Sequence, residues 1–311
     1  MLTLYQGDPL YPVSGFVVGL LVGMTGVRGG SLMTPLLILF AGIKPVIAIG
    51  TDLAYGAVTK TVGGWRHFRK DTVDLRIALW LGAGSIPGAI GGVWLLDVLH
   101  RAYGKDFDTI VLVMVAAALT ITGVAVLWRA LFMPRLVARE RETLDMGRGH
   151  KIAAVAMGLA IGFVLGVTSA GSGSLIAIGL ILVYRLSPRR VVGTDVFHAA
   201  ILLWVAGIAH LISGNVDLGL AANILVGSVP GVWIGVALST RLPETGLRPA
   251  LGVVLLASAL GLLNKAGAPI PPAVVFAVPA ALGALAWSLH RLRRRTAPRP
   301  ARAPLASEAS S

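Results

Sequence analysis

The chain has 311 residues, of which 56% are hydrophobic and 13% are charged, and its formal net charge is +13. A soluble domain carries about twice that charged fraction, and apolar stretches long enough to cross a bilayer recur along the whole length. The basic residues lie in short segments between these stretches, as membrane topology alone requires, so we expect no nucleic-acid partner. The absence of cysteine excludes disulfides and thiolate metal sites.

Hydropathy and turn residues predict eleven helical elements and no strands. In chain order they cover residues 10–26, 30–41, 46–66, 75–97, 109–131, 152–169, 173–185, 189–211, 218–240, 248–264 and 272–290. The N-terminus lacks the basic start and the cleavage site of a signal peptide, so we expect the first element to remain in the mature protein. The fold class is therefore an all-α polytopic membrane protein.

An internal repeat relates the two halves of the chain at an offset of 143 residues. Between 15–95 and 158–238, 29 of 81 positions are identical without a gap, where composition alone would give about a tenth. The matches include polar and turn residues: Gly50-Thr51-Asp52 with Gly193-Thr194-Asp195, and Ser85-x-Pro87-Gly88 with Ser228-x-Pro230-Gly231. Repeats of this kind are typical of transporter folds.

Each repeat also contains two runs of glycine with a spacing of four residues. They are Gly15, Gly19, Gly23 and Gly84, Gly88, Gly92 in the first repeat, and Gly158, Gly162, Gly166 and Gly227, Gly231, Gly235 in the second. This spacing places small residues on one helix face and predicts close helix packing. The alternative use of such faces is a homodimer interface.

The distribution of Lys and Arg predicts the topology. One set of alternate connections holds 22 of these residues and the other set holds four, which places the N-terminus outside and the C-terminus in the cytoplasm of the cell (inner) membrane. The two repeats then cross in opposite directions. The predicted units are a first inverted repeat (10–131), a basic cytoplasmic loop (132–151), a second inverted repeat (152–264), an extra transmembrane helix (272–290) and a disordered cytoplasmic tail (291–311).

The first two elements of each five-element repeat are short legs around a turn of small residues. A leg such as 31–40 is about 15 Å long if it is helical, half of the hydrocarbon thickness, so we predict re-entrant or broken hairpins. Irregular backbone at that depth is tolerated where it lines a cavity. In inverted repeats, the two turns approach the membrane midplane from opposite sides, where such folds bind substrate.

The residues of these turns suit a small anion. The second legs begin with free N–H groups and a positive dipole end, and neutral hydroxyl donors let a transported anion leave again. The alternative is that the serines are ordinary N-caps and the glycines simple turns. The predicted substrate-binding residues are Thr25, Arg28, Gly29, Gly30, Ser31, Thr168, Ser169, Gly171, Ser172, Gly173 and Ser174.

Asp52 and Asp195 are the carboxylates that lie well inside predicted spans. Carboxylates at such depth are costly and mark ion or proton pathways, so we hypothesise that one or both accept a coupling proton; a capping or interhelical hydrogen bond is the alternative. Tyr55 and His198 follow one turn later and face the same site or, alternatively, pack in the core. The predicted residues for ion coupling or gating are Asp52, Asp195, Thr51, Thr194, Tyr55 and His198.

Two further pairs of residues receive structural predictions. Asp74 and Asp217 precede apolar spans after a turn and are expected to be N-caps. His67 and His210 are expected at the membrane interfaces. No motif for a resident metal or another cofactor is present, so we expect neither.

The motifs of both repeats resemble those of the TauE/SafE family of sulfite and organosulfonate exporters. The resemblance covers residues 10–264 and depends on Gly29-Gly30-Ser31-x-x-x-Pro35 and on the Gly-Thr segment with the basic loop from His67 to Asp74. It implies a permease for sulfite, sulfoacetate or a related sulfur anion. Arg28 interrupts the usual glycine run, and the second turn reads Gly-Ser-Gly-Ser. An Arg at the tip favours a more highly charged anion.

These observations predict a secondary transporter that moves a small anion through the lipid bilayer by alternating access around a midplane site, with proton coupling. The substrate implied by the resemblance is sulfite or an organosulfonate such as sulfoacetate. An anion channel is the alternative. A membrane-embedded enzyme is disfavoured, because the sequence contains no HExxH, GxSxG or paired acidic metal motif.

Overall fold

A computed structural model of the chain describes residues 9–25, 30–132, 146–170, 172–239 and 244–295. The elements in this part of the chain are helices: α1 (Leu10–Thr25), α2 (Gly30–Leu39), α3 (Pro45–Arg69), α4 (Leu75–Tyr103), the 3-10 turn η1 (Gly104–Asp106), α5 (Phe107–Phe132), α6 (Arg148–Thr168), α7 (Ser172–Leu182), α8 (Pro188–Ile212), α9 (Leu218–Ser239), α10 (Glu244–Lys265) and α11 (Pro272–Arg295). The eleven predicted helices are confirmed. Several continue past their predicted ends, because hydropathy marks the apolar part of a helix whereas its hydrogen bonds continue into more polar sequence.

Four stretches of the described residues are long and apolar enough to cross a membrane: Leu75–Trp128, which contains both α4 and α5, Arg148–Thr168, Pro188–Ile212 and Leu218–Gly235. The helices α2 and α7 have only 10 and 11 residues, so neither can span a hydrocarbon core of about 30 Å alone. This contrast agrees with the predicted short legs.

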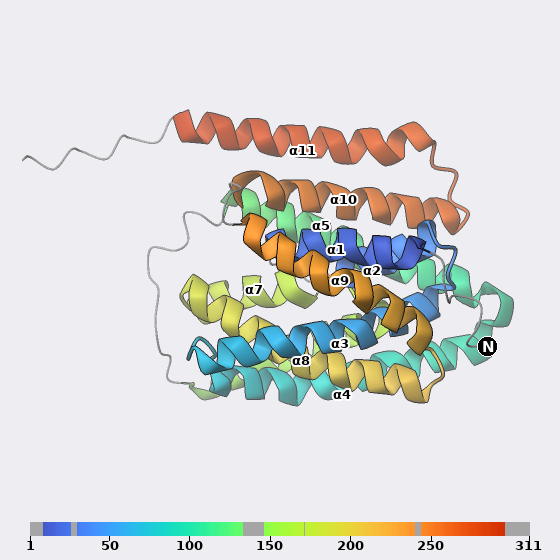
Figure 1. Ribbon diagram of the computed structural model, residues 1–311. Coiled ribbons are helices and arrows are strands. Elements are labelled where there is room, and N and C mark those ends of the chain that lie inside the picture. Colours follow the sequence, from blue (N-terminus) through green and yellow to red (C-terminus); the bar gives the residue numbers. More distant parts are fainter. Residues whose placement is uncertain (1–8, 26–29, 133–145, 171, 240–243, 296–311) are drawn as a thin grey trace, which may run out of the picture.

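The helices lie side by side with similar axis directions, and α11 lies outside α10 at one edge (Figure 1).

The main helix pairs exchange partners between the two repeats. Helix α1 packs along α9, and α6, the repeat counterpart of α1, packs along α4, the counterpart of α9. The remaining two major pairs, α3 with α8 and α5 with α10, each join counterparts to one another. Every major contact of one repeat therefore has an equivalent contact in the other.

Glycine makes these pairs close, as the spacing predicted. A Cβ added to Gly19 would overlap the backbone of Ser228, and a Cβ added to Gly162 would overlap the backbone of Ser85, the repeat counterpart of Ser228. Helix backbones approach this closely only where one partner has no side chain. The glycine runs therefore pack helices within one chain.

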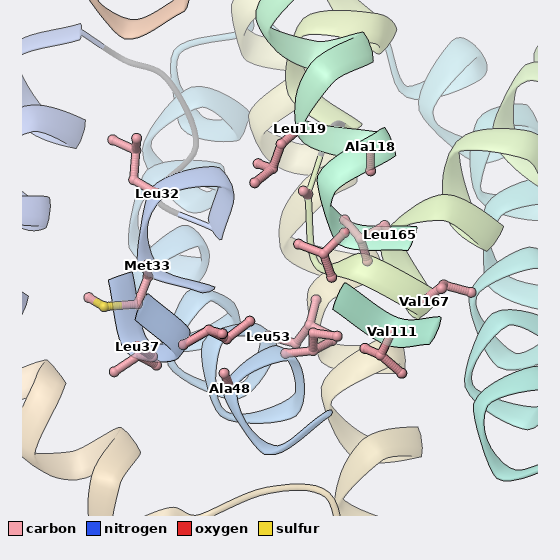
Figure 2. Close-up of a cluster of buried hydrophobic side chains, with 14 of the residues drawn as sticks. Leu32, Met33, Leu37, Ala48, Leu53, Val111, Ala118, Leu119, Leu165 and Val167 are labelled. Carbon is pink, nitrogen blue, oxygen red and sulfur yellow. The ribbon is translucent and has the colours of Figure 1, made fainter. Parts of the chain in front are cut away.

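A buried apolar cluster surrounds the short helix α2. Figure 2 shows Leu32, Met33 and Leu37 of α2 beside Ala48 and Leu53 of α3, with side chains of α5 and α6 on the opposite side. The C-terminal end of α2 is also fixed by a polar contact, since Lys265 Nζ donates to the Ile38 carbonyl at 2.5 Å. A cation at the C-terminal end of a helix complements its dipole.

The two predicted N-caps are confirmed. The Asp74 carboxylate accepts from the Ile77 N–H at 3.1 Å, and the Asp217 carboxylate accepts from the Leu220 N–H at 2.9 Å. These bonds satisfy donors at the start of α4 and α9 that have no acceptor within the helix.

Candidate functional site

The predicted turn residues fall into three groups. Arg28, Gly29 and Gly171 lie outside the described residues. The backbones of Thr25, Gly30, Ser31, Ser172 and Ser174 belong to helix ends: Thr25 ends α1, Gly30 and Ser31 begin α2, and Ser172 and Ser174 lie in the first turn of α7. Gly173 also lies in that turn, and Thr168 and Ser169 form the end of α6. Among the described residues, α2, α3 and the end of α6 meet at one polar contact.

Asp52 is the centre of a polar contact between the two repeats. Its carboxylate is buried, with 1% of the residue exposed. The Oδ2 atom accepts a hydrogen bond of 2.6 Å from Thr34 Oγ1 on α2 and another of 2.6 Å from Ser169 Oγ at the end of α6. Asp52 therefore joins the short helix of the first repeat to the turn of the second.

The second carboxylate oxygen of Asp52 has different surroundings. Oδ1 is buried and has no hydrogen-bond partner within the described residues. An unsatisfied carboxylate oxygen in a buried site is costly. It is an atom at which a proton or a donor of a bound ligand would be accommodated.

Ser169 is held by the backbone as well as by Asp52. Its φ of 58° is in the left-handed region, where it ends α6, and its N–H donates to the Leu165 carbonyl at 2.7 Å. Left-handed backbone is uncommon for a residue with a side chain, so the surrounding contacts must hold it. Thr168 supports the turn, because its Oγ1 donates to the Val164 carbonyl at 2.6 Å and accepts from the Ala170 N–H at 3.2 Å.

The equivalent position in the second repeat differs chemically. In the repeat alignment Thr34 corresponds to Ala177 and Ser169 corresponds to Gly26, and neither of these residues carries a hydroxyl. Asp195 is also only half-buried. The duplicated aspartates therefore occupy different environments.

Tyr55 and His198 are both buried, at 3% and 1% exposure. His198 Nε2 lies 2.8 Å from Ser85 Oγ, which is on α4. This bond links α8 to α4 two residues before Pro87, which lies inside α4. It matches the alternative interpretation of His198 as a hydrogen-bonded core residue. The other interpretation, a role in ion coupling or gating, stays a prediction.

Thr51 and Thr194 each form a hydrogen bond with the opposite repeat. Thr51 Oγ1 accepts from the Asp217 N–H at 3.0 Å, and Thr194 Oγ1 accepts from the Asp74 N–H at 2.9 Å. The two bonds are equivalent under the repeat. The structure thus provides these threonines with a role in joining the start of each N-capped helix to the other half of the chain.

Replacing Thr51 or Thr194 with valine is expected to lower the free energy of unfolding by about 1–3 kcal/mol each, because a half-buried backbone N–H loses its acceptor. Thr122→Val is a matched control, since buried Thr122 donates to the Ala118 carbonyl of its own helix and not to another helix within the described residues. Thermal unfolding of the purified variants measures the effect. Equal stability of all three would contradict the assigned role.

Sequence reasoning missed Thr34, which is not repeated and therefore did not stand out in the self-comparison. The spacing of residues along the helix could nevertheless have indicated Thr34. Thr34 follows Ser31 by three residues, which places both on one face of α2.

Four apolar stretches long enough to cross a membrane, together with a carboxylate buried between the duplicated halves, define a multi-pass helical membrane protein with a polar site in its interior. Residues 11–262 match the family described as Sulfite exporter TauE/SafE. The chain belongs to this family, as the motifs predicted.

The chain is also similar to curated proteins over most of its length. It is 39% identical over 249 residues to the Probable membrane transporter protein YjnA of Bacillus subtilis, a match that covers 80% of this chain and 97% of the relative. It is 28% identical to YdhB, another probable membrane transporter protein of that bacterium, over 76% of this chain and 92% of the relative. A probable membrane transporter protein of Xylella fastidiosa is 26% identical over 79% of this chain and 91% of its own length. No solved structure matches the chain.

Proposed function

We propose that the protein is a secondary transporter that moves a small anion by alternating access, with sulfite or an organosulfonate such as sulfoacetate as substrate. The family supports the class of protein. The observation that carries the mechanism is the contact of Asp52 with Thr34 and Ser169, because it places an ionisable group between the two repeats at the turns that would bind substrate.

The proposed transporter consists of two repeats that cross the membrane in opposite directions. The exchange of partners among α1, α4, α6 and α9 supports a two-fold relation between them, and the excess of Lys and Arg on one side supports opposite orientations. The N-terminus is then outside and the C-terminus cytoplasmic. Alternating access would move one hairpin against the other repeat around the site.

The chemistry of the turns supports an anionic substrate. The N-terminal ends of α2 and α7 follow the two turns, and the free N–H groups and dipole of a helix start favour negative charge. Uncharged donors hold an anion weakly enough for release. Protonation of Asp52 at Oδ1 would remove a negative charge from the site while an anion is bound there.

Burial of the described site residues supports a transporter over an open channel. Asp52, Thr168 and Ser169 are each no more than 5% exposed. Substrate could reach them only after the surrounding helices move. A moving barrier predicts saturable flux, whereas a channel would conduct in proportion to the gradient.

The proposal is tested with purified protein in proteoliposomes. Uptake of radiolabelled sulfite is expected to saturate, to respond to an imposed proton gradient and to be inhibited by sulfoacetate more strongly than by acetate. In detergent, saturating substrate at 100 times its Kd adds about 2.7 kcal/mol to the apparent stability, which corresponds to a Tm increase of about 5 °C or more. Flux that rises linearly with concentration would identify a channel, and the absence of both binding and flux would overturn the substrate class.

A further inference from the structure

His210 occupies an unexpected place for a residue predicted at the membrane interface. It lies in the last turn of α8, yet none of its surface is exposed. Its Nε2 atom lies 2.8 Å from the carbonyl oxygen of Gly166. A carbonyl can only accept, so Nε2 carries the proton and donates it. The other ring nitrogen, Nδ1, is buried without a partner in the described part of the chain, which fits a ring with one proton.

The acceptor of this bond belongs to the end of α6. The last four carbonyls of a helix have no partner within it. Ser169 N–H binds the Leu165 carbonyl, and the imidazole of His210 binds the next one, that of Gly166. Three residues after Gly166, the hydroxyl of Ser169 reaches Asp52. The histidine therefore fixes the backbone that presents Ser169.

His210 also packs against α3, the helix that carries Asp52. A Cβ built on Gly50 would lie 3.2 Å from the Cβ of His210, and Gly50 precedes Asp52 by two residues. One side chain thus touches both elements whose relative position brings Asp52 and Ser169 together. Because Gly50 is also pressed against the Asn215 backbone, little space is available for either element to shift.

The repeat counterpart of His210 makes a different contact. His67 is half-buried, and its Nδ1 lies 3.0 Å from Thr72 Oγ1 in the loop that follows its own helix. The two histidines are identical in the repeat alignment, but their bonds differ. His67 therefore offers a matched control.

We propose that His210 is a positioning residue for the Asp52–Ser169 contact: it holds the end of α6 so that the turn of the second repeat meets the carboxylate of the first. The inference extends the proposed function, which assigns Asp52 and Ser169 to the transport site. Loss of the imidazole bond would release the turn without removing any group of the site itself.

The absence of cysteine from the chain permits a test that does not depend on transport. Ala170, buried next to Ser169, is replaced with cysteine, and the rate of its reaction with a maleimide is measured in the purified protein. His210→Leu is expected to raise this rate about tenfold, the ratio that one buried hydrogen bond supports. His210→Gln, which keeps an N–H donor, and His67→Leu are expected to stay within about threefold of the parent.

General unfolding is separated from release of the turn by a second reporter. Ala154 lies within α6, far from its end, and is as buried as Ala170, so labelling of Ala154→Cys should not change in His210→Leu. If the leucine variant cannot be purified, His210→Asn replaces it, because its shorter side chain does not reach Gly166. Unchanged labelling of Ala170→Cys, equal acceleration at both reporters, or failure of His210→Gln to restore the parent rate would each overturn the inference.

A transport measurement extends the test to function. His210→Leu is expected to slow uptake about tenfold, and the double variant with Ser169→Ala should be no slower than Ser169→Ala alone, because both changes act on one contact. Additive losses would overturn the positioning role. If the unmodified protein takes up no anion, the proposed function fails, and the labelling rates still decide the role of His210.

Discussion

Replacement of Asp52 by asparagine is expected to remove the response of anion uptake to a proton gradient. The amide is nearly the same size as the carboxylate, and its oxygen can still accept the hydroxyls of Thr34 and Ser169, so the fold should persist. It cannot exchange a proton, however. Uptake driven by a pH gradient should fall about 100-fold, at the upper end of typical couplings between two bound species, whereas exchange of labelled for unlabelled anion without a gradient should continue.

The matched control is Asp195→Asn. In the repeat alignment Thr34 and Ser169 correspond to Ala177 and Gly26, which carry no hydroxyl. Asp195 is also less buried than Asp52, so we expect this variant to retain the response to the gradient. Uptake is measured in proteoliposomes with and without an imposed pH difference, and a protonophore should reduce the parent protein to the level of Asp52→Asn. A gradient response that survives in Asp52→Asn would rule out this residue as the proton carrier.

The difference between the two aspartates marks how far sequence reasoning could go. The self-comparison identified Asp52 and Asp195 as a pair, since it detects identity. What distinguishes them lies at positions where the repeats differ, Thr34 against Ala177 and Ser169 against Gly26. Which of these positions meet the aspartate depends on packing between helices distant in the chain, and periodicity within one helix does not contain that information.

The helices themselves could be predicted well, because their signals are local. Pro at a helix start and Asp before a span locate the starts of α3 and α4 to within one residue. The depth of a residue along the membrane can be estimated in the same way, but its burial against neighbours cannot. His210 illustrates this limit: its position near a helix end predicted an interface, while packing against Gly50 and Gly166 buries it completely.

The threonines of the repeated Gly-Thr-Asp segment show a second limit. Their identity in both halves favoured a role in coupling, which stays a prediction. The structure shows that each also accepts a hydrogen bond from a backbone N–H of the opposite repeat. A contact that occurs twice constrains both copies of a residue equally. Duplication alone therefore does not separate residues that join the halves from residues that handle substrate.

A single methyl group at Gly84 is expected to destabilise the protein strongly, whereas the same group two residues earlier should not. A Cβ on Gly84 would overlap the Val155 carbonyl and approach the Leu159 N–H of α6. The helices α4 and α6 would have to separate along one of the main contacts of the fold. Overpacking of this kind costs about 1–3 kcal/mol, so Gly84→Ala should lower the Tm by about 5 °C.

Gly82→Ala is the control on the same helix, because a Cβ there meets nothing within 4 Å. Alanine in a helix interior is favoured over glycine by up to about 1 kcal/mol, so this variant should equal or exceed the parent in Tm. Gly227→Ala, at the repeat counterpart of Gly84, would overlap the Pro12 carbonyl of α1 and should be as harmful as Gly84→Ala. Thermal unfolding in detergent compares the three. A Gly84→Ala protein as stable as Gly82→Ala would mean that α4 and α6 do not approach as closely as their glycines permit, and a stable Gly227→Ala protein would show that the two halves pack differently.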